Sequence, residues 1–233
     1  MKKLGVFTVL AASALCFLVW LSPLKAHANS VTMTFTGVGP QDNNSGGVYT
    51  YPYDFTVTPT TGPSENLSLM CISFDQEIYL QTPNEYWTAN VVTAGSLGAT
   101  DEEEAYLYTQ AVANVNSNTI SGAANWADWA LGGSTTLAGQ ESFLASHISG
   151  TELNDADNYL TYLAGLSSAD LAEYADYLVY EPVNGTEVPL SDGLPQTFIG
   201  GPSPVPEPSS LILFGSGLLS AAGALYRRKR RTA

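Results

Sequence analysis

Carboxylates are the commonest groups in this chain that could do chemistry. The sequence contains 22 Asp and Glu residues, and some stand two positions apart, as Asp75 and Glu77 or Asp155 and Asp157 do. Most glycoside hydrolases use two carboxylates placed on either side of the bond that they cleave. A carbohydrate-active hydrolase with paired carboxylates is therefore one alternative, although such pairs also arise by chance in so acidic a sequence.

Other catalytic patterns are absent from the sequence. Apart from His27 near the start, the chain has one histidine, His147, and nothing indicates which serine would join it in a Ser-His-Asp site. The motifs Gly-x-Ser-x-Gly and His-Glu-x-x-His do not occur, and neither does a phosphate-binding Gly-rich loop. We therefore expect a protein that is not an enzyme.

The acidic side chains could also bind a cation. Calcium takes oxygen ligands, and Asp155-Ala156-Asp157-Asn158 begins like the calcium-binding loop of an EF-hand. No Gly or closing Glu follows at the spacing that this loop requires. We expect no cofactor, and calcium remains the open alternative.

Tyrosines could form a binding face. Tyr49, Tyr51 and Tyr53 alternate along one expected strand, so their side chains would lie on the same side of it. Such a row could line a carbohydrate-binding face or pack into the core, because tyrosine has an apolar ring and a polar tip. A glycan- or calcium-binding module is therefore a second alternative.

Cys71 and the segment Asn125-Trp126-Ala127-Asp128-Trp129 resemble a pattern of bacterial surface adhesins. The thioester domains of these adhesins pair a strand cysteine with a helical Gln-x-Ala-apolar-Trp motif. Here Asn125 stands in place of Gln, and Asp128 in place of the apolar residue. The resemblance implies a β-rich fold and a crosslink between Cys71 and Asn125. Otherwise the cysteine and the two tryptophans are core residues, as free cysteines often are.

Basic residues are confined to the two ends of the chain. All eight Lys and Arg lie at positions 2–25 or 227–231, and all 22 acids lie between these two groups. An acidic body of this kind lacks the Lys and Arg with which proteins bind nucleic acid or anionic lipid. Cys71 is also the only cysteine after Cys16, so we expect no internal disulfide.

The C-terminal end has three parts in order. Val205-Pro206-Glu207-Pro208 lies in a Pro-rich spacer at 201–208, and an uncharged apolar segment follows at 209–226. This segment is long enough for a transmembrane helix, and Arg227-Arg228-Lys229-Arg230-Arg231 would stop its transfer. Together, positions 205–231 resemble the PEP-CTERM sorting signal of exported surface proteins in Gram-negative bacteria. The resemblance implies that an exosortase recognises the Pro-Glu-Pro element and removes the apolar helix.

The N-terminal end is typical of a signal peptide at 1–28. Met1-Lys2-Lys3 is basic, an apolar stretch follows, and Ala26-His27-Ala28 is a cleavage site of the A-x-A type. We therefore expect the general secretion machinery to export the chain. The C-terminal helix would hold an intermediate in the inner membrane before the protein reaches the cell surface or extracellular matrix. There we expect a structural or adhesive role, with exopolysaccharide or matrix as a partner; the hydrolase alternative would act in the envelope.

The residues between these ends, 29–200, predict one acidic α+β domain. We expect a β-rich sandwich or barrel-like fold with a helical insert at about 100–175. Asp101-Glu102-Glu103-Glu104 indicates the start of a helix, since acids there interact favourably with the helix dipole. Alternation and β-branched residues predict strands at 31–37, 48–57, 67–75, 86–92, 177–183 and 196–199. The fold must therefore bring the strand of Cys71 to the helix of Asn125.

Overall fold

The computed structural model describes residues 30–39, 44–45, 47–76, 85–188 and 195–202. These residues lie in one compact unit, His27–Ser203. The expected signal peptide, with Ala26 and Ala28, and the expected sorting signal with its helix at 209–226 lie outside the described residues. Among the helices that are described, none has both the length and the apolar character needed to cross a membrane.

Six strands form a closed barrel in the order β1-β4-β5-β8-β7-β6. Every neighbouring pair is antiparallel, and β1 pairs with both β4 and β6. The α+β, barrel-like prediction is therefore confirmed for the described residues. The strands are β1 (Ser30–Val38), β4 (Tyr53–Pro59), β5 (Glu65–Cys71), β6 (Tyr86–Thr93), β7 (Tyr177–Pro182) and β8 (Phe198–Pro202), and β2 (Asn44–Ser45) pairs with β3 (Val48–Tyr49) separately.

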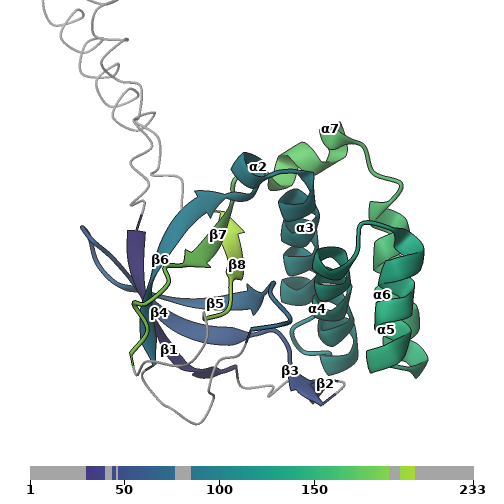
Figure 1. Cartoon of the computed structure of the whole chain (residues 1–233), viewed down its shortest axis with the longest axis horizontal. Helices are drawn as coiled ribbons and strands as arrows, with labels where there is room; N and C mark the ends of the chain where they lie inside the picture. Colours follow the sequence, from purple (N-terminus) through teal and green to yellow (C-terminus); the bar gives the residue numbers. More distant parts are fainter. Residues whose placement is uncertain (1–29, 40–43, 46, 77–84, 189–194, 203–233) are drawn as a thin grey trace, which may run out of the picture. The chain divides into compact units, whose positions relative to one another are not determined.

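The helices lie between β6 and β7 in the sequence. Figure 1 shows α3 and α4 next to the barrel, with α5 and α6 beyond them. The chain therefore leaves the barrel after β6, builds the helical layer and returns to complete the barrel wall. The helices are α2 (Ala94–Leu97), α3 (Ala99–Ala113), α4 (Asn118–Gly133), α5 (Leu137–His147), α6 (Gly150–Leu163), α7 (Ser168–Leu171) and the 3-10 helix η1 (Ala172–Tyr174).

Helix α4 is the centre of the helical layer. It packs against α3, α5 and α6, and every residue at positions 121–130 is buried. Many of these residues are Ala or Gly, whose small side chains let neighbouring helices approach closely. Ser117 begins the helix by accepting a hydrogen bond from the backbone N–H of Ile120. The elements packed around α4 therefore fix the positions of its side chains.

Aromatic side chains fill the barrel. Tyr53, Phe55 and Val57 of β4 are buried while the residues between them are partly exposed, as expected for a strand with one face on the core. The Phe55 ring lies 4.7 Å from the Phe198 ring and 5.6 Å from the Trp87 ring between centroids. Side chains of β4, β6 and β8 therefore meet in the interior.

Candidate functional site

The structure brings Cys71 and Asn125 into contact. Asn125 on α4 donates a hydrogen bond from Nδ2 to the backbone oxygen of Cys71, at 2.8 Å. Its Oδ1 accepts a hydrogen bond from the backbone N–H of Tyr51, at 2.9 Å. Both Asn125 and Cys71 are fully buried. One amide side chain thus joins α4 to the end of β5 and to the segment that precedes β4.

Trp129 adds a third hydrogen bond to this contact. It lies four residues after Asn125, on the same face of α4, and donates from Nε1 to the same Cys71 oxygen at 3.0 Å. We refer to Tyr51, Cys71, Asn125 and Trp129 as the Cys71 node. The Asn-x-x-x-Trp spacing therefore has a structural use, which is to fasten the helical layer to the barrel.

The Cys71 thiol is held in its unreactive form. Its Sγ donates to the backbone oxygen of Ser73 at 3.4 Å, and burial raises the pKa of the thiol to about 12. The thiolate, which is the nucleophilic form, is therefore scarce at neutral pH. The Cys71–Asn125 crosslink stays a prediction, while the hydrogen bonds of the Cys71 node already give Asn125 a non-covalent role.

The predicted row of Tyr49, Tyr51 and Tyr53 does not form an open face. Tyr51 and Tyr53 are buried, and the Tyr53 hydroxyl donates to the backbone oxygen of Tyr49 at 2.7 Å. Tyr49 lies on β3, whereas Tyr53 begins β4. The chain turns between the two strands, so the alternation does not continue along one strand.

A larger group of tyrosines spans the barrel and the helical layer. Neighbouring rings in this group lie 5.3–6.1 Å apart between centroids, which is the range of favourable ring contacts. The group begins in the core and ends at the surface, where one side chain is 53% exposed. We call this group the tyrosine band; in order of contact its members are Tyr51, Tyr108, Tyr177, Tyr174, Tyr106 and Tyr162.

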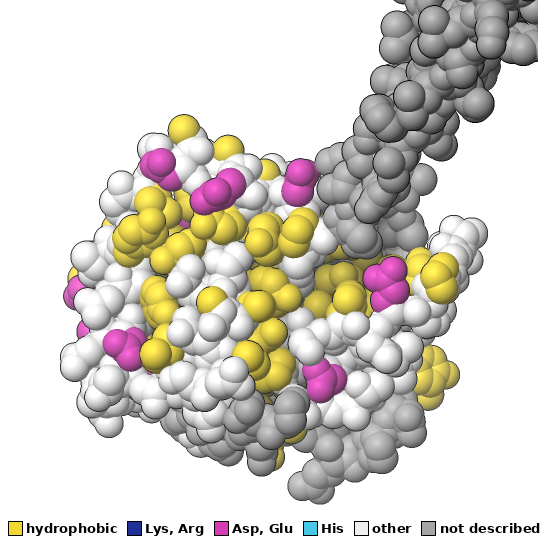
Figure 2. Space-filling model, turned by 180° about the vertical axis from the view of Figure 1, so that it is seen from behind, with side chains coloured by type: hydrophobic (Ala, Val, Ile, Leu, Met, Phe, Trp, Pro, Cys, Tyr) yellow, Lys and Arg dark blue, Asp and Glu magenta, His cyan; other side chains and the backbone are white. Residues whose placement is uncertain are grey.

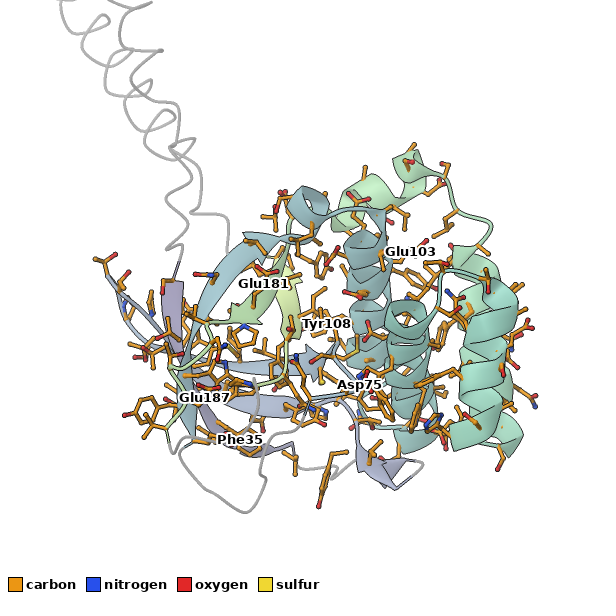
Figure 3. The ribbon with its side chains drawn as sticks, in the orientation of Figure 1. Phe35, Asp75, Glu103, Tyr108, Glu181 and Glu187 are labelled. Atoms are coloured by element: carbon orange, nitrogen blue, oxygen red, sulfur yellow. The ribbon has the colours of Figure 1, made fainter. Side chains whose placement is uncertain are left out.

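Carboxylates lie near several members of the tyrosine band, with Asp54 acting on Tyr51 and Glu173 on Tyr174 and Tyr177. Figure 3 shows the Tyr108 side chain of α3 between this helix and the barrel, with Glu103 on the same helix and Glu181 on β7. Burial, followed by a hydrogen bond and charge repulsion from Glu173, raises the pKa of Tyr174 to about 12. The hydroxyl therefore stays protonated at neutral pH and can donate hydrogen bonds. Figure 2 shows one face of the domain, on which apolar side chains gather between isolated acidic ones.

Comparison with known protein families finds one match. The PEP-CTERM protein-sorting motif matches residues 204–231, which include the expected recognition element at 205–208 and the basic residues at 227–231. This chain carries a PEP-CTERM sorting signal. Neither the curated proteins nor the solved structures contain a significant match.

The sorting signal tells where this PEP-CTERM protein goes. The motif marks an exported protein that an exosortase handles at the membrane. The resemblance to a sorting signal is thus confirmed, whereas no comparison supports the resemblance to thioester adhesins. The motif covers only the C-terminal end, so the role of the folded domain must be inferred from its own residues.

The acid pairs that the sequence indicates do not form a site in the described part of this PEP-CTERM protein. Glu77 lies outside the described residues, so its relation to Asp75 is not given. Asp155 and Asp157 are both on α6, and residues two positions apart in a helix do not face each other. Within the described residues, no three His, Cys, Asp or Glu side chains are placed to hold a metal ion.

His147 belongs to an aromatic cluster on α4 and α5. Its ring lies 4.4 Å from the Phe143 ring and 5.3 Å from the Trp126 ring between centroids. Ser146 Oγ lies 2.9 Å from His147 Nδ1, but the same hydroxyl donates to the Phe143 backbone oxygen at 2.7 Å. Since the proton of Ser146 is directed at the backbone, these residues lack the arrangement of a nucleophile and its base.

Proposed function

We propose that this PEP-CTERM protein is a structural or adhesive component of the cell surface or extracellular matrix of a Gram-negative bacterium, and that its tyrosine band binds neutral polysaccharide. The sorting signal supports the location. The observation that carries the binding role is the tyrosine band itself, which runs from the core to the surface through ring contacts. The anchored rings form a stiff apolar surface with polar tips.

Such a surface suits a sugar chain. The flat face of a pyranose ring exposes C–H groups that pack on aromatic rings, while its hydroxyls need hydrogen-bond partners. Tyrosine supplies both, because a large ring carries a hydroxyl and loses little conformational entropy when it binds. Glu173, beside Tyr174 and Tyr177, adds a carboxylate that can accept hydrogen bonds from sugar hydroxyls.

The charge of the domain determines which polysaccharides the tyrosine band can bind. The chain has no Lys or Arg between positions 26 and 226, so the domain has no such cation to pair with uronate or sulfate groups. Like charges brought together across an interface cost several kcal/mol. We therefore propose neutral glycans as the ligand class and expect polyanionic ones to be repelled.

We also propose that the domain is not an enzyme. A catalytic carboxylate pair must reach a substrate, whereas Glu104 and Asp128, whose carboxyl groups interact electrostatically, are almost completely buried. The ligand would therefore be bound and released unchanged.

Tyr162→Ala and Tyr174→Ala are expected to weaken polysaccharide binding by roughly tenfold each, since an aromatic anchor commonly contributes more than about 1 kcal/mol. The measurement is affinity electrophoresis in native gels that contain hydroxyethyl cellulose or dextran. The wild-type protein should be retarded by at least one of these neutral polymers. It should not be retarded by alginate, which is polyanionic.

Tyr86→Ala is the matched control for these variants. Tyr86 is 41% exposed on β6 and makes no ring contact with the band. It should keep wild-type retardation. The proposed role of the band would be contradicted if Tyr86→Ala lost as much polysaccharide binding as Tyr162→Ala does. It would also be contradicted if alginate retarded the wild-type protein as strongly as the neutral polymers do.

Intact mass spectrometry of protein from the native host tests processing. We expect a chain that begins at Asn29 and lacks the apolar segment at 209–226, because the ends have the composition of a signal peptide and a sorting signal. We also expect no loss of ammonia, since the buried Cys71 thiol is protonated. A retained C-terminal segment would instead mean a stable membrane anchor. A mass lower by one ammonia would support the Cys71–Asn125 crosslink.

A further inference from the structure

Two carboxyl groups lie inside the helical layer, and the charge of Glu104 acts on Asp128. Asp128 on α4 is fully buried, and Glu104 on the adjacent helix α3 is 6% exposed. Within the described residues, neither carboxyl oxygen of Asp128 has a hydrogen-bond partner, and Oε2 of Glu104 has none. We call these two residues the acid pair. Buried polar groups normally have partners, so the absence of one here requires an explanation.

Among the described residues there is no Lys or Arg to balance the acid pair. The groups that act on it electrostatically are Asp101 and Glu103 of α3, and the Cys71 thiol of β5 also feels Asp128. The sequences of α2, β2 and β8, which also pack here, contain no titratable residue. The remaining packed elements contribute Glu141 and His147 from α5, Glu152, Asp155, Asp157, Tyr159 and Tyr162 from α6, Asp170 from α7, and Glu173 and Tyr174 from η1.

His147 is therefore the one group among these that can become cationic. Its ring lies against the Trp126 and Phe143 rings, and its Nδ1 lies 2.8 Å from the Phe143 backbone oxygen. It is also exposed, whereas Asp128 is sealed inside the layer. An unpaired carboxylate in such an interior costs several kcal/mol, and the group takes up a proton instead.

We propose that the acid pair is a pH-responsive lock: as neutral carboxylic acids, Asp128 and Glu104 let α3 pack against α4, and their ionisation at higher pH loosens the helical layer. The lock needs no ligand, because protons from the medium set its state. It also explains how two acids can occupy the interface of two helices in a domain without Lys or Arg.

The direction of the pH dependence follows from the same contacts. Burial raises the pKa of Asp128 well above its usual range, and Glu104 and then Asp101 raise it further. Burial likewise raises the pKa of Glu104, with Asp101 and Glu103 adding to the effect. The folded state thus holds protons that the unfolded chain releases near pH 4. The stabilisation is complete below that pH and is lost as the pH rises through the folded-state pKa values.

The test is the unfolding temperature of the purified full chain between pH 4 and pH 8. We expect the wild-type midpoint to fall by roughly 5–10 °C over this range. Asp128→Asn keeps the shape of the side chain but removes its charge, so it should melt higher than the wild type at pH 8 and show a flatter profile. Asp155→Asn is the control, because it removes one of the other acids, on α6, and should keep the wild-type slope.

A second variant and a local measurement cover the case in which Asp128→Asn does not fold. Glu104→Gln should also flatten the pH profile. In the wild type, amide hydrogen exchange corrected for intrinsic rates should accelerate in α3 and α4 between pH 5 and pH 8, more than in the barrel strands. A wild-type midpoint that is flat or rises with pH would overturn the proposal. Equal slopes for Asp128→Asn and Asp155→Asn, or acceleration shared equally by the barrel, would do the same.

Discussion

An Asn125→Asp variant is expected to lose about 3–5 kcal/mol of unfolding free energy at pH 7, which is the usual cost of leaving a buried charge unpaired. The new carboxylate could still accept the hydrogen bond from the Tyr51 N–H. It would lose the Nδ2 donor and place an oxygen against the Cys71 carbonyl oxygen, where Asn125 now donates at 2.8 Å. It would also bring a third acid close to the acid pair.

Asn125→Ala should cost less, about 1–3 kcal/mol, because it introduces no charge and removes only the side-chain acceptor of the buried Tyr51 N–H and one of the two donors to the Cys71 oxygen. The Cys71 oxygen keeps its hydrogen bond from Trp129 Nε1 at 3.0 Å. The order of stability at pH 7 is therefore expected to be wild type, then Asn125→Ala, then Asn125→Asp. Urea unfolding measures this order.

Two comparisons make this result specific to the Cys71 node. Asn158→Asp makes the same chemical change at an exposed position of α6 and should stay within about 0.5 kcal/mol of the wild type. The defect of Asn125→Asp should shrink at pH 4, where the new carboxyl group is protonated. If Asn125→Asp were as stable as Asn158→Asp at pH 7, the hydrogen bonds of the Cys71 node would not be formed in solution.

Phe198→Ala is expected to destabilise the domain by about 3–5 kcal/mol, the usual cost of removing a buried aromatic ring. The Phe198 ring is fully buried and lies 4.7 Å from the Phe55 ring and 5.5 Å from the Tyr53 ring between centroids. It comes from β8, which joins β5 to β7 and so completes the barrel wall. Its loss would leave a cavity where the side chains of several strands meet.

Phe198→Leu provides the graded comparison, and urea unfolding is again the measurement. Leucine fills much of the space and should cost clearly less than alanine. Tyr86→Ala removes an exposed aromatic side chain and should have a small effect. A Phe198→Ala protein with wild-type stability would show that β8 does not close the barrel in solution.

The sequence predicts the kinds of elements well, because alternation, β-branched residues and the acids at the start of α3 are local signals. It does not predict that the barrel closes. Closure depends on pairs such as β5 with β8, whose members are separated by the whole helical insert. The sequence predicts a strand through position 75, but β5 ends at Cys71, after which Ile72 donates to the Thr197 backbone oxygen.

The candidate site could be predicted only in part. Cys71 and Asn125 do meet, but through the backbone oxygen of the cysteine, which no side-chain motif can indicate. The tyrosine band could not be predicted from the sequence, because its six members come from separate parts of the chain. Asp128 could have been recognised, since it is an acid in the middle of an otherwise apolar helical stretch.

The closed barrel has a consequence for an exported protein of the surface or matrix role that we propose. An open sheet ends in strands with unpaired N–H and C=O groups, and these edges are templates for aggregation. In this barrel β1 and β6 pair with each other, so the described strands of the barrel form a closed sheet with no edge strand. Such barrels can crowd on a surface without adding strands to one another. Cohesion of a matrix that contains them would therefore come from side chains and ligands.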